Sequence, residues 1–397
     1  MYNILYISYD GVLEPLGQSQ VLAYLKKLAK SQTIHLISFE KKEDWGNKDN
    51  RKKIKLEIAS SGIVWHPLRY HKRLSVISTG WDIFCGTLVG TLLVLRYQIK
   101  IIHARSYVAS VIALTLKKIL GVKFIFDMRG FWVDERVDGE IWRKNGILFK
   151  IGKWFERKFL KNADHIISLT KAAIREIKNF DFLNNHNLSF TIIPTCTDLT
   201  HFKPISGYRN SKFILGYVGS VGTWYLFDEV LVCFKLLLSI LPEAKLLIIN
   251  RGEHNYIQNR IENSGISINS IELISSAFND IPTQMARMDA GVFFIKKAYS
   301  KIASAPTKLG EFLACGVPCL SNAGIGDTDE ILEGEKVGVS IENLNPESIF
   351  EGLKNLIILV DNNETSSRCV YVANKYFSLN EGVNLYLKVY QEVKGIN

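Results

Sequence analysis

The sequence of 397 residues lacks most features that mark secretion, metal binding or nucleic-acid binding. Its six cysteines form no CxxC pair and no Cys/His cluster of zinc spacing, so we expect reduced thiols and no metal site. Residues 1–10 lack the basic region and cleavage site of a signal peptide, which favours a cytoplasmic protein. RNA-module signatures and a helix-turn-helix pattern are also missing, so we expect no nucleic-acid partner.

Charge is distributed unevenly along the chain. Residues 1–204 hold 32 Lys and Arg and 18 Asp and Glu, a net charge of +14, whereas residues 205–397 hold 17 and 21, a net charge of −4. A basic half joined to a mildly acidic half suggests that the first half meets an anionic partner. We therefore expect peripheral contact with an anionic membrane, on the inner face of the cell membrane.

Two segments bear on that expectation. Residues 76–95 are nearly apolar over about the width of a bilayer, but Asp82 interrupts them, so we expect a buried helix of an α/β domain instead of a span. Residues 147–161 place apolar side chains at helical spacing among lysines and arginines, which is typical of a helix on a membrane surface. An ordinary basic packing helix is an equal interpretation of the second segment.

The alternation of β-rich and helical segments along the chain predicts the fold class. Short β-rich runs such as "NILYISYD", "IKIIHAR" and "VKFIFDMRG" are mostly separated by helical stretches, and the pattern restarts after residue 210 with "KFILGYVGS" and "AKLLIIN". This alternation predicts two parallel sheets wrapped by helices, one in each half. The boundary is expected in the polar stretch 201–212, and ligands are expected beyond the carboxyl ends of the strands.

The stretch "SAPTKLGEF" predicts a helix that begins without a capping side chain. If Pro306 is the first helical residue, the N-cap is Ala305, whose methyl side chain cannot accept a hydrogen bond. The N–H groups of Thr307 and Lys308 would then form a diphosphate site at the positive end of the helix dipole. Glu311 shares their face, and its carboxylate could accept from ribose hydroxyls. The alternative is a surface Lys308–Glu311 pair on a helix capped by water.

Five blocks in order resemble the signature blocks of glycosyltransferase family 4. They are "ISYDGVLEPLGQSQVLAYLKKLA", "IIHARSY", "ADHIISLTKAA", "IIPTCTDLTHFKP" and "PTKLGEFLACGVPCL". The resemblance implies two Rossmann-like domains in the GT-B arrangement: an acceptor-binding domain over 1–204 and a nucleotide-sugar-binding domain over 205–379. It further implies that residues 380–397 pack back on the first domain. Sugar transfer with retention of configuration, and without a bound metal or cofactor, is also implied.

The site residues come from the resemblance together with local chemistry. His103, which we place at a strand end, corresponds to a histidine near the transferred sugar, and with Lys308 it is predicted to be catalytic. The predicted donor-nucleotide residues are Gly219, Ser220, Gly222, Arg251, Lys301, Ser304, Pro306, Thr307, Lys308 and Glu311. The predicted acceptor residues are Gly17, Gln18, Asp127, Arg129 and Asp134. A salt-bridged loop is an alternative interpretation of the last three.

The sequence also departs from the family pattern. Ala303 stands where the E-x7-E motif has its first glutamate, which leaves the donor sugar open. Residues 216–229 lack the arginine and lysine that many relatives place there, so the cation must come from elsewhere. The remaining candidates are Arg251, Lys296, Lys297, Lys301 and Lys308. The "DTD" at 327–329 looks like the DxD motif of another architecture, and we expect no metal there.

These observations predict a retaining glycosyltransferase. It would move a sugar from a UDP- or GDP-sugar to a glycan or lipid-linked acceptor, in bacterial surface polysaccharide or glycoconjugate synthesis. Two alternatives stay open: a nucleotide-sugar epimerase of the same architecture, and a non-catalytic basic protein that binds membranes or nucleic acid.

Overall fold

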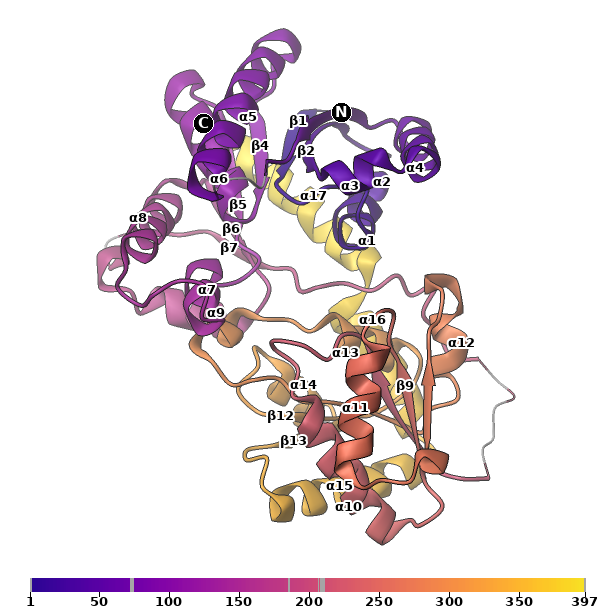
Figure 1. The fold of residues 1–397 in the computed structure, drawn as a ribbon. Helices are drawn as coiled ribbons and strands as arrows, with labels where there is room; N and C mark the ends of the chain where they lie inside the picture. Colours follow the sequence, from indigo (N-terminus) through magenta and orange to yellow (C-terminus); the bar gives the residue numbers. More distant parts are fainter. Residues whose placement is uncertain (1, 72–74, 185, 206, 208–210, 396–397) are drawn as a thin grey trace. The chain divides into compact units, whose positions relative to one another are not determined.

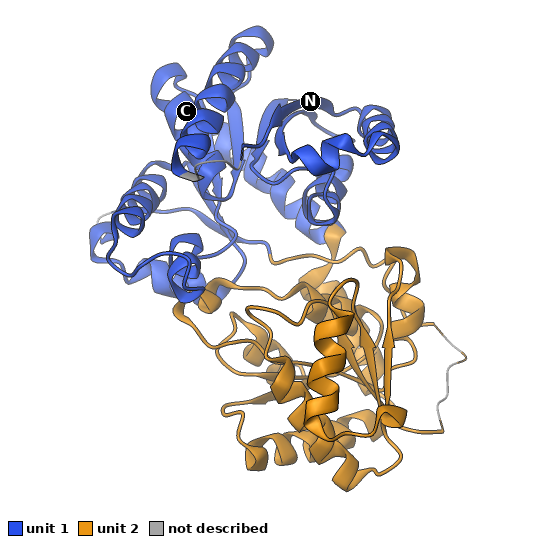
Figure 2. Cartoon of the chain, viewed as in Figure 1, with its two compact units in different colours: residues 1–193, 380–397 blue, residues 194–379 orange. Residues whose placement is uncertain are grey.

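The computed structural model describes residues 2–71, 75–184, 186–205, 207 and 211–395, and the chain folds into α/β units (Figure 1). Unit 1 comprises residues 1–193 and 380–397, and unit 2 comprises residues 194–379 (Figure 2). The expected boundary after residue 204 lies inside unit 2. Residues 194–204 belong to unit 2 because two backbone hydrogen bonds join them to it. The Thr197 N–H donates to the Phe377 carbonyl at 2.7 Å, and the Leu379 N–H donates to the Thr197 carbonyl at 3.0 Å.

Unit 1 is built on a seven-stranded parallel sheet of order β3-β2-β1-β4-β5-β6-β7. Its strands are β1 (Asn3–Ser8), β2 (Thr33–Glu40), β3 (Val64–Arg69), β4 (Ile101–Arg105), β5 (Lys123–Asp127), β6 (His165–Ser168) and β7 (Phe190–Ile192). Its helices are α1 (Pro15–Gly17), the π-helix η1 (Gln18–Leu22), α2 (Ala23–Leu28), α3 (Lys42–Gly46), α4 (Lys48–Ser60), α5 (Ser75–Tyr97), α6 (Ser106–Leu120), α7 (Trp132–Asp138), α8 (Ile147–Asn162), α9 (Lys171–Lys178), the 3-10 turn η2 (Asp181–Leu183) and α17 (Leu379–Gly395).

The central strands of unit 1 are covered on both faces. Successive strand residues point to opposite faces: Leu5 of β1 lies under α5, next to Gly90, whereas the ring of Tyr6 contacts His103 and belongs to the face covered by α17. This explains why β1 and β4 are near-continuous apolar runs, as expected for a parallel sheet. In Figure 1 the yellow α17 accordingly lies among the indigo elements of unit 1.

Unit 2 is built on a six-stranded parallel sheet of order β10-β9-β8-β11-β12-β13. Its strands are β8 (Ile214–Val218), β9 (Lys245–Ile249), β10 (Ile271–Ile274), β11 (Ala290–Phe293), β12 (Cys319–Asn322) and β13 (Gly338–Ile341). Its helices are α10 (Phe227–Ile240), α11 (His254–Ser264), α12 (Ile281–Met285), α13 (Thr307–Ala314), α14 (Thr328–Gly334), α15 (Pro346–Asp361) and α16 (Thr365–Phe377), with 3-10 turns η3 (Ile268–Ser270), η4 (Phe278–Asp280) and η5 (Tyr299–Ala303). Separate apolar clusters pack on the two faces of this sheet.

The two sheets confirm the predicted fold class of two parallel-sheet α/β domains. One helix differs from its prediction. Residues 76–95 do form a helix, α5, but only 22% of its apolar window is buried, so the expectation of a buried helix is wrong. By length and composition α5 is also the one helix, among the described residues, that is long and apolar enough to cross a membrane.

Candidate functional site

The loop that follows β8 is the first element of the candidate site in unit 2. Gly219 has a φ of +106°, which favours glycine, and a Cβ there would lie 3.4 Å from the Lys308 Nζ. Two side chains beyond β9 hold the loop: Asn250 Nδ2 donates to the Gly219 carbonyl at 3.0 Å, and the Val221 N–H donates to Glu253 Oε2 at 3.1 Å. The loop is therefore fixed close to Lys308.

The helix that carries Lys308 begins one residue later than expected. Pro306 is the N-cap of α13, with an extended ψ of 122°, and Thr307 is the first helical residue, so the prediction of Ala305 as the cap is wrong. A proline side chain cannot accept a hydrogen bond, and no described side chain caps this helix. The central feature of the prediction, a helix N-terminus without a protein cap, is therefore present.

The amino group of Lys308 is buried and makes no hydrogen bond with any residue that the structure describes. Its side chain is 6% exposed, and no described residue forms a hydrogen bond with its Nζ. The Nζ lies 3.6 Å from the ring centroid of Tyr225 and 4.7 Å from that of Tyr217, so aromatic faces are its neighbours. Burial lowers the pKa of Lys308 to about 7, although the charges of Glu311 and Glu253 oppose this. Such a site would favour an anion.

Glu311 lies one turn further along α13. Burial raises its pKa to about 7, although the charge of Lys308 opposes the shift. The Lys308 Nζ is buried without a hydrogen bond to any described residue, and the partly buried Glu311 carboxylate is desolvated enough to raise its pKa, so both charged forms are disfavoured in the unliganded protein. A ligand carrying hydroxyl donors and an anion would stabilise both charged forms.

Lys301 lies beside this pair in sequence but contacts a different ring. It is buried in η5, with its Nζ 3.6 Å from the ring centroid of Trp224. Ala303 of the same turn is also buried, so no polar side chain replaces the missing glutamate at that position. Ser304 and Thr307 are half-buried next to Pro306.

The structure thus brings Gly219, Lys308 and Glu311 together, and it leaves other predicted residues at the surface. Ser220 and Gly222 are exposed in the loop after β8, and Arg251 is exposed after β9. Sequence reasoning missed the residues that shape this site. They are Tyr217, Trp224, Tyr225, Asn250 and Glu253. The aromatic pair in "GTWYLF" was the available signal, whereas nothing local marked Asn250 or Glu253.

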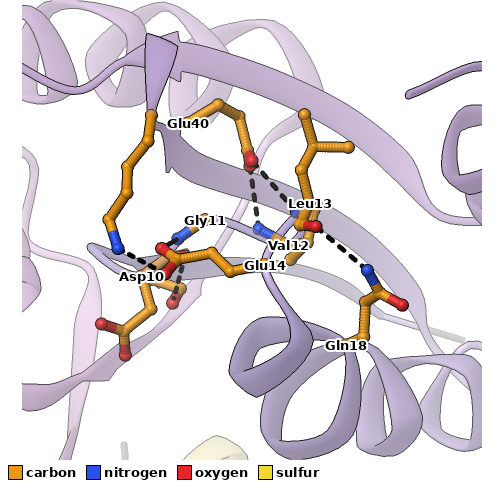
Figure 3. A network of polar contacts seen from close by, with 9 residues as sticks. Asp10, Gly11, Val12, Leu13, Glu14, Gln18 and Glu40 are labelled. Atoms are coloured by element: carbon orange, nitrogen blue, oxygen red, sulfur yellow. Dashed lines mark hydrogen bonds and ion pairs between the residues drawn. The ribbon is translucent and has the colours of Figure 1, made fainter. Parts of the chain in front are cut away.

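In unit 1, Glu40 organises the loop between β1 and α1 (Figure 3). This residue ends β2, and its buried carboxylate accepts from the N–H groups of Val12 and Leu13 at 3.0 and 3.1 Å and from Ser38 Oγ at 2.6 Å. Burial raises the pKa of Glu40, and these donors oppose the shift. A carboxylate missed by sequence reasoning therefore holds the loop that precedes two predicted acceptor residues, Gly17 and Gln18.

Gly17 and Gln18 shape that loop. A Cβ at position 17 would lie 1.9 Å from the Gly11 carbonyl oxygen, so only glycine permits this approach. Gln18 Nε2 donates to the Leu13 carbonyl at 3.0 Å, as Figure 3 shows. Their visible function is to fix the loop conformation, and acceptor binding by these residues stays a prediction.

His103 occupies a different place from the one predicted. β4 continues to Arg105, so His103 is a mid-strand residue, and its side chain is fully buried. Its Nδ1 is 2.8 Å from the Tyr390 hydroxyl of α17, and its Nε2 is 3.4 Å from Asp127 Oδ2. Burial lowers the pKa of His103, against the opposing effect of Asp127. With both ring nitrogens directed at protein groups, His103 is a structural residue of unit 1, and we withdraw its catalytic assignment.

Asp127 belongs to the same buried cluster. Its Oδ2 accepts from the Tyr386 hydroxyl at 2.9 Å. Burial by itself would raise the pKa of Asp127, but the charge of Arg129 and the hydrogen bond with His103 outweigh it and hold the pKa below its ordinary value. Because this carboxylate is fully buried, the predicted direct contact with an acceptor is not supported.

The remaining two acceptor candidates differ from each other. Arg129 is half-buried with a φ of +58°, and its Nη1 is buried without a hydrogen bond to any described residue, so it stays an acceptor candidate. Asp134 lies on α7 and accepts from Lys153 Nζ of α8 at 2.9 Å. Asp134 therefore forms a salt bridge, but it does so from a helix and not from a loop, and acceptor binding by it stays a prediction.

Metal ligation and cavities add two observations. Over the part of the chain that the structure describes, no group of three or more His, Cys, Asp and Glu side chains could hold a metal ion. A cavity of about 330 Å³ lies at the amino ends of β8, β9 and β10, at the opposite edge of the sheet from the loop after β8. We therefore do not assign this cavity to the donor.

Two family models match separate parts of the chain. The model "Glycosyl transferase 4-like domain" matches residues 57–188, and "Glycosyl transferases group 1" matches residues 200–376. With the two parallel-sheet domains, these matches define a protein of the GT-B class. The chain is a glycosyltransferase of the GT-B type.

Solved structures share the whole fold at low sequence identity. Sucrose-phosphate synthase from Thermosynechococcus elongatus is 11% identical with a TM-score of 0.76, and 100% of both chains is covered. A glycosyltransferase from Rickettsia africae is 15% identical with a TM-score of 0.72, covering 100% of this chain and 99% of the other. The Anabaena protein HepE, in complex with UDP and glucose, is 12% identical with a TM-score of 0.67, covering 98% and 100%. A search of curated proteins gave no match.

Proposed function

We propose that this protein is a retaining glycosyltransferase that uses a nucleotide-diphosphate sugar as donor and a glycan or lipid-linked molecule as acceptor. The observation that carries the proposal is Lys308, a buried cation without a hydrogen bond among the described residues, beside a glycine that permits close backbone approach. Neither the fold nor the family identifies the donor. The chemistry of this site favours an anionic, hydroxyl-bearing ligand, which a nucleoside diphosphate supplies.

In the proposed complex, unit 2 holds the donor nucleotide. The Lys308 ammonium and the N-terminus of α13 would bind the diphosphate, and the Glu311 carboxylate would accept from the ribose hydroxyls. UDP is the leading candidate because structures of HepE contain UDP and UDP-glucose. GDP remains the second candidate.

Lys308 would also serve the chemical step. The bond between the anomeric carbon and the diphosphate oxygen breaks, and its electron pair leaves with the diphosphate. The acceptor oxygen then bonds to the same face of the sugar, which retains the configuration, and its proton passes to the departing phosphate oxygen. The charge that develops on this oxygen would be stabilised by the Lys308 ammonium in a desolvated site, where electrostatic stabilisation is strongest. We assign no side-chain nucleophile and no metal to this step.

The acceptor is proposed to belong to bacterial surface polysaccharide or glycoconjugate synthesis. Two similar structures are described as the lipopolysaccharide outer core galactosyltransferase WaaB and as WaaG, a glycosyltransferase involved in lipopolysaccharide biosynthesis. In this proposal the loop held by Glu40 and the half-buried Arg129 are the parts of unit 1 available to an acceptor. The proposed location is the cytoplasm, at the inner membrane face.

A thermal-shift panel of UDP, GDP, CMP and dTDP tests the donor assignment, because a ligand that binds only the folded state raises its stability. We expect one diphosphate to raise the Tm of the wild type, with a smaller shift for Lys308→Ala. Anomeric NMR of the product then tests retention. Turnover of the sugar nucleotide to an epimer without any acceptor would instead support the epimerase, and no shift with any nucleotide would contradict the proposal.

A further inference from the structure

The outer surface of α5 carries a continuous row of large apolar side chains, which we call the α5 stripe. Spacings of three and four residues place its members on one face of the helix. The stripe consists of Ile77, Trp81, Phe84, Leu88, Leu92 and Leu95, each between 53% and 71% exposed. At 1.5 Å per residue it is about 27 Å long. Six neighbouring exposed apolar side chains differ from the scattered single apolar residues that are normal on the surface of soluble proteins.

The opposite face of α5 packs closely on the domain through two glycines in its middle, and Leu93 and Val94 are buried near its end. A Cβ added at Gly86 would lie 2.6 Å from Ile112 Cδ1, and one at Gly90 would lie 2.8 Å from Leu116 Cδ1, so both glycines allow close contact with α6. Asp82, also on this side, is buried and accepts from the Tyr9 hydroxyl at 2.8 Å. A surface helix normally turns its large apolar side chains inward. In α5 most of the large apolar side chains are exposed and only Leu93 and Val94 are buried. The close packing at Gly86 and Gly90 fixes which face is outward.

The charges around the stripe indicate what covers it. The members of the stripe are uncharged, and the exposed charges nearest to it in sequence are basic: Arg96 at the end of α5 and Lys100 just beyond it. Unit 1 as a whole holds 33 Lys and Arg against 19 Asp and Glu, a net charge of +14. A second copy on the stripe would bring two strongly basic units together. An anionic lipid surface would instead be attracted by each basic residue close to it.

We propose that the α5 stripe inserts into the outer part of an anionic bilayer leaflet, with α5 lying along the membrane surface. Trp81 and Phe84, whose ring centroids are 5.6 Å apart, supply aromatic groups suited to the interface. α5 is the crossover between β3 and β4 of one sheet, so spanning the bilayer would require removing it from α6 and β1. The inference concerns membrane contact and does not rest on the proposed glycosyl transfer.

α8, the basic helix predicted over residues 147–161, contributes less to the proposed membrane contact than α5 does. α8 packs on α6, as α5 does. It exposes Ile147, Ile151 and Trp154 together with basic side chains. Its apolar row is shorter than the α5 stripe, so α5 supplies most of the buried apolar area and α8 contributes charge.

Flotation of the full-length protein with vesicles tests the proposal. The vesicles contain either phosphatidylcholine alone or phosphatidylcholine with phosphatidylglycerol. The test variant is Phe84→Ser/Leu88→Ser/Leu92→Ser. The matched control, Leu56→Ser/Ile268→Ser/Ile358→Ser, removes three apolar side chains that are equally exposed elsewhere. We expect the wild type and the control to float with the anionic vesicles, more strongly at low salt. The test variant should lose at least roughly tenfold in binding, since burial of even one large side chain is worth about that factor and three are replaced.

A second readout needs no variant. Cys85 lies next to Phe84 and is the one cysteine of the six that is not buried. Anionic vesicles should slow its modification by a charged maleimide in the wild type. Unchanged modification, or a test variant that floats like the wild type, would overturn the proposal. The proposal would also be overturned if the wild type sedimented as a dimer and the test variant as a monomer, while both floated equally with the vesicles. Nucleotide thermal shifts in the same variants report on the proposed function separately.

Discussion

Lys308 is expected to destabilise the unliganded protein and to bind the nucleoside diphosphate. A lysine buried without a hydrogen bond among the described residues is destabilising unless its ligand is present. We therefore expect Lys308→Met to raise the Tm of the unliganded protein by several degrees, at about 2–4 °C per kcal/mol. The same variant should lose the Tm shift caused by a nucleoside diphosphate. Thermal denaturation with and without nucleotide measures both, and a Tm below that of the wild type would show that Lys308 stabilises the fold.

The pH dependence of this difference has a definite sign. Burial lowers the pKa of Lys308 from 10.5 to about 7, so between these values the unfolded chain binds this proton and the folded chain does not. Stability therefore rises with pH across this window, and the cost of Lys308 is fully present below about pH 7. The Tm advantage of Lys308→Met should shrink as the pH is raised from 7 towards 10.

Glu40 gives a prediction for unit 1. Its carboxylate accepts from two backbone N–H groups and one hydroxyl, and removing a buried acceptor leaves each donor unsatisfied at about 1–3 kcal/mol. We expect Glu40→Ala to lower the free energy of unfolding and to impair use of the acceptor, with nucleotide affinity unchanged. Urea unfolding and nucleotide calorimetry measure the two effects. Equal losses of nucleotide and acceptor binding would contradict the assignment of this loop to the acceptor.

At the residue scale, the sequence predicted local geometry, whereas the binding roles of the site residues stay predictions. Lys308 and Glu311 lie on one short helix, so their spacing and the missing cap could be read directly. His103 failed for the opposite reason: its Tyr390 partner is 287 residues away. The prediction also placed His103 at the end of its strand, whereas β4 continues to Arg105.

Among the elements, the strands were the most predictable part. Parallel strands covered on both faces are short apolar runs, and each described strand overlaps one of the β-rich runs in the sequence. For α5 the composition predicted a helix but gave the wrong burial. Which face packs is decided by Gly86 and Gly90 meeting Ile112 and Leu116, and these contacts depend on the tertiary fold.

The attachment of α17 to unit 1 gives a second stability prediction for that unit. The Tyr386 hydroxyl donates to a buried carboxylate, Asp127, and the Tyr390 hydroxyl pairs with an imidazole, His103. Hydrogen bonds to charged groups are worth about 1.5–3 kcal/mol and neutral ones about 1 kcal/mol. Tyr386→Phe should therefore reduce the free energy of urea unfolding more than Tyr390→Phe does. Tyr371→Phe, at a mostly exposed tyrosine, is the control, and equal effects of all three substitutions would contradict this account.

For the whole molecule, the proposed use of Lys308 and a helix N-terminus makes a prediction about metals. Because the protein's own cation would neutralise the leaving diphosphate, activity should persist in excess EDTA once a donor is known. The assay compares turnover before chelation, after chelation and after addition of Mg²⁺ or Mn²⁺. Activity that disappears with EDTA and returns with either ion would place a metal in the reaction and direct attention to Asp327 and Asp329.

The central claim is that unit 2 binds a nucleoside diphosphate through Lys308 and Glu311, and isothermal titration calorimetry tests it most directly. UDP and uridine are titrated into the wild type, Lys308→Ala, Glu311→Ala and Glu311→Gln. Loss of one charged hydrogen bond, about 1.5–3 kcal/mol, predicts roughly 10- to 150-fold weaker UDP binding by Glu311→Ala, with a smaller loss for Glu311→Gln. Lys308→Ala should weaken UDP more than uridine. Unchanged UDP affinity in folded Glu311→Ala and Lys308→Ala proteins would contradict the claim.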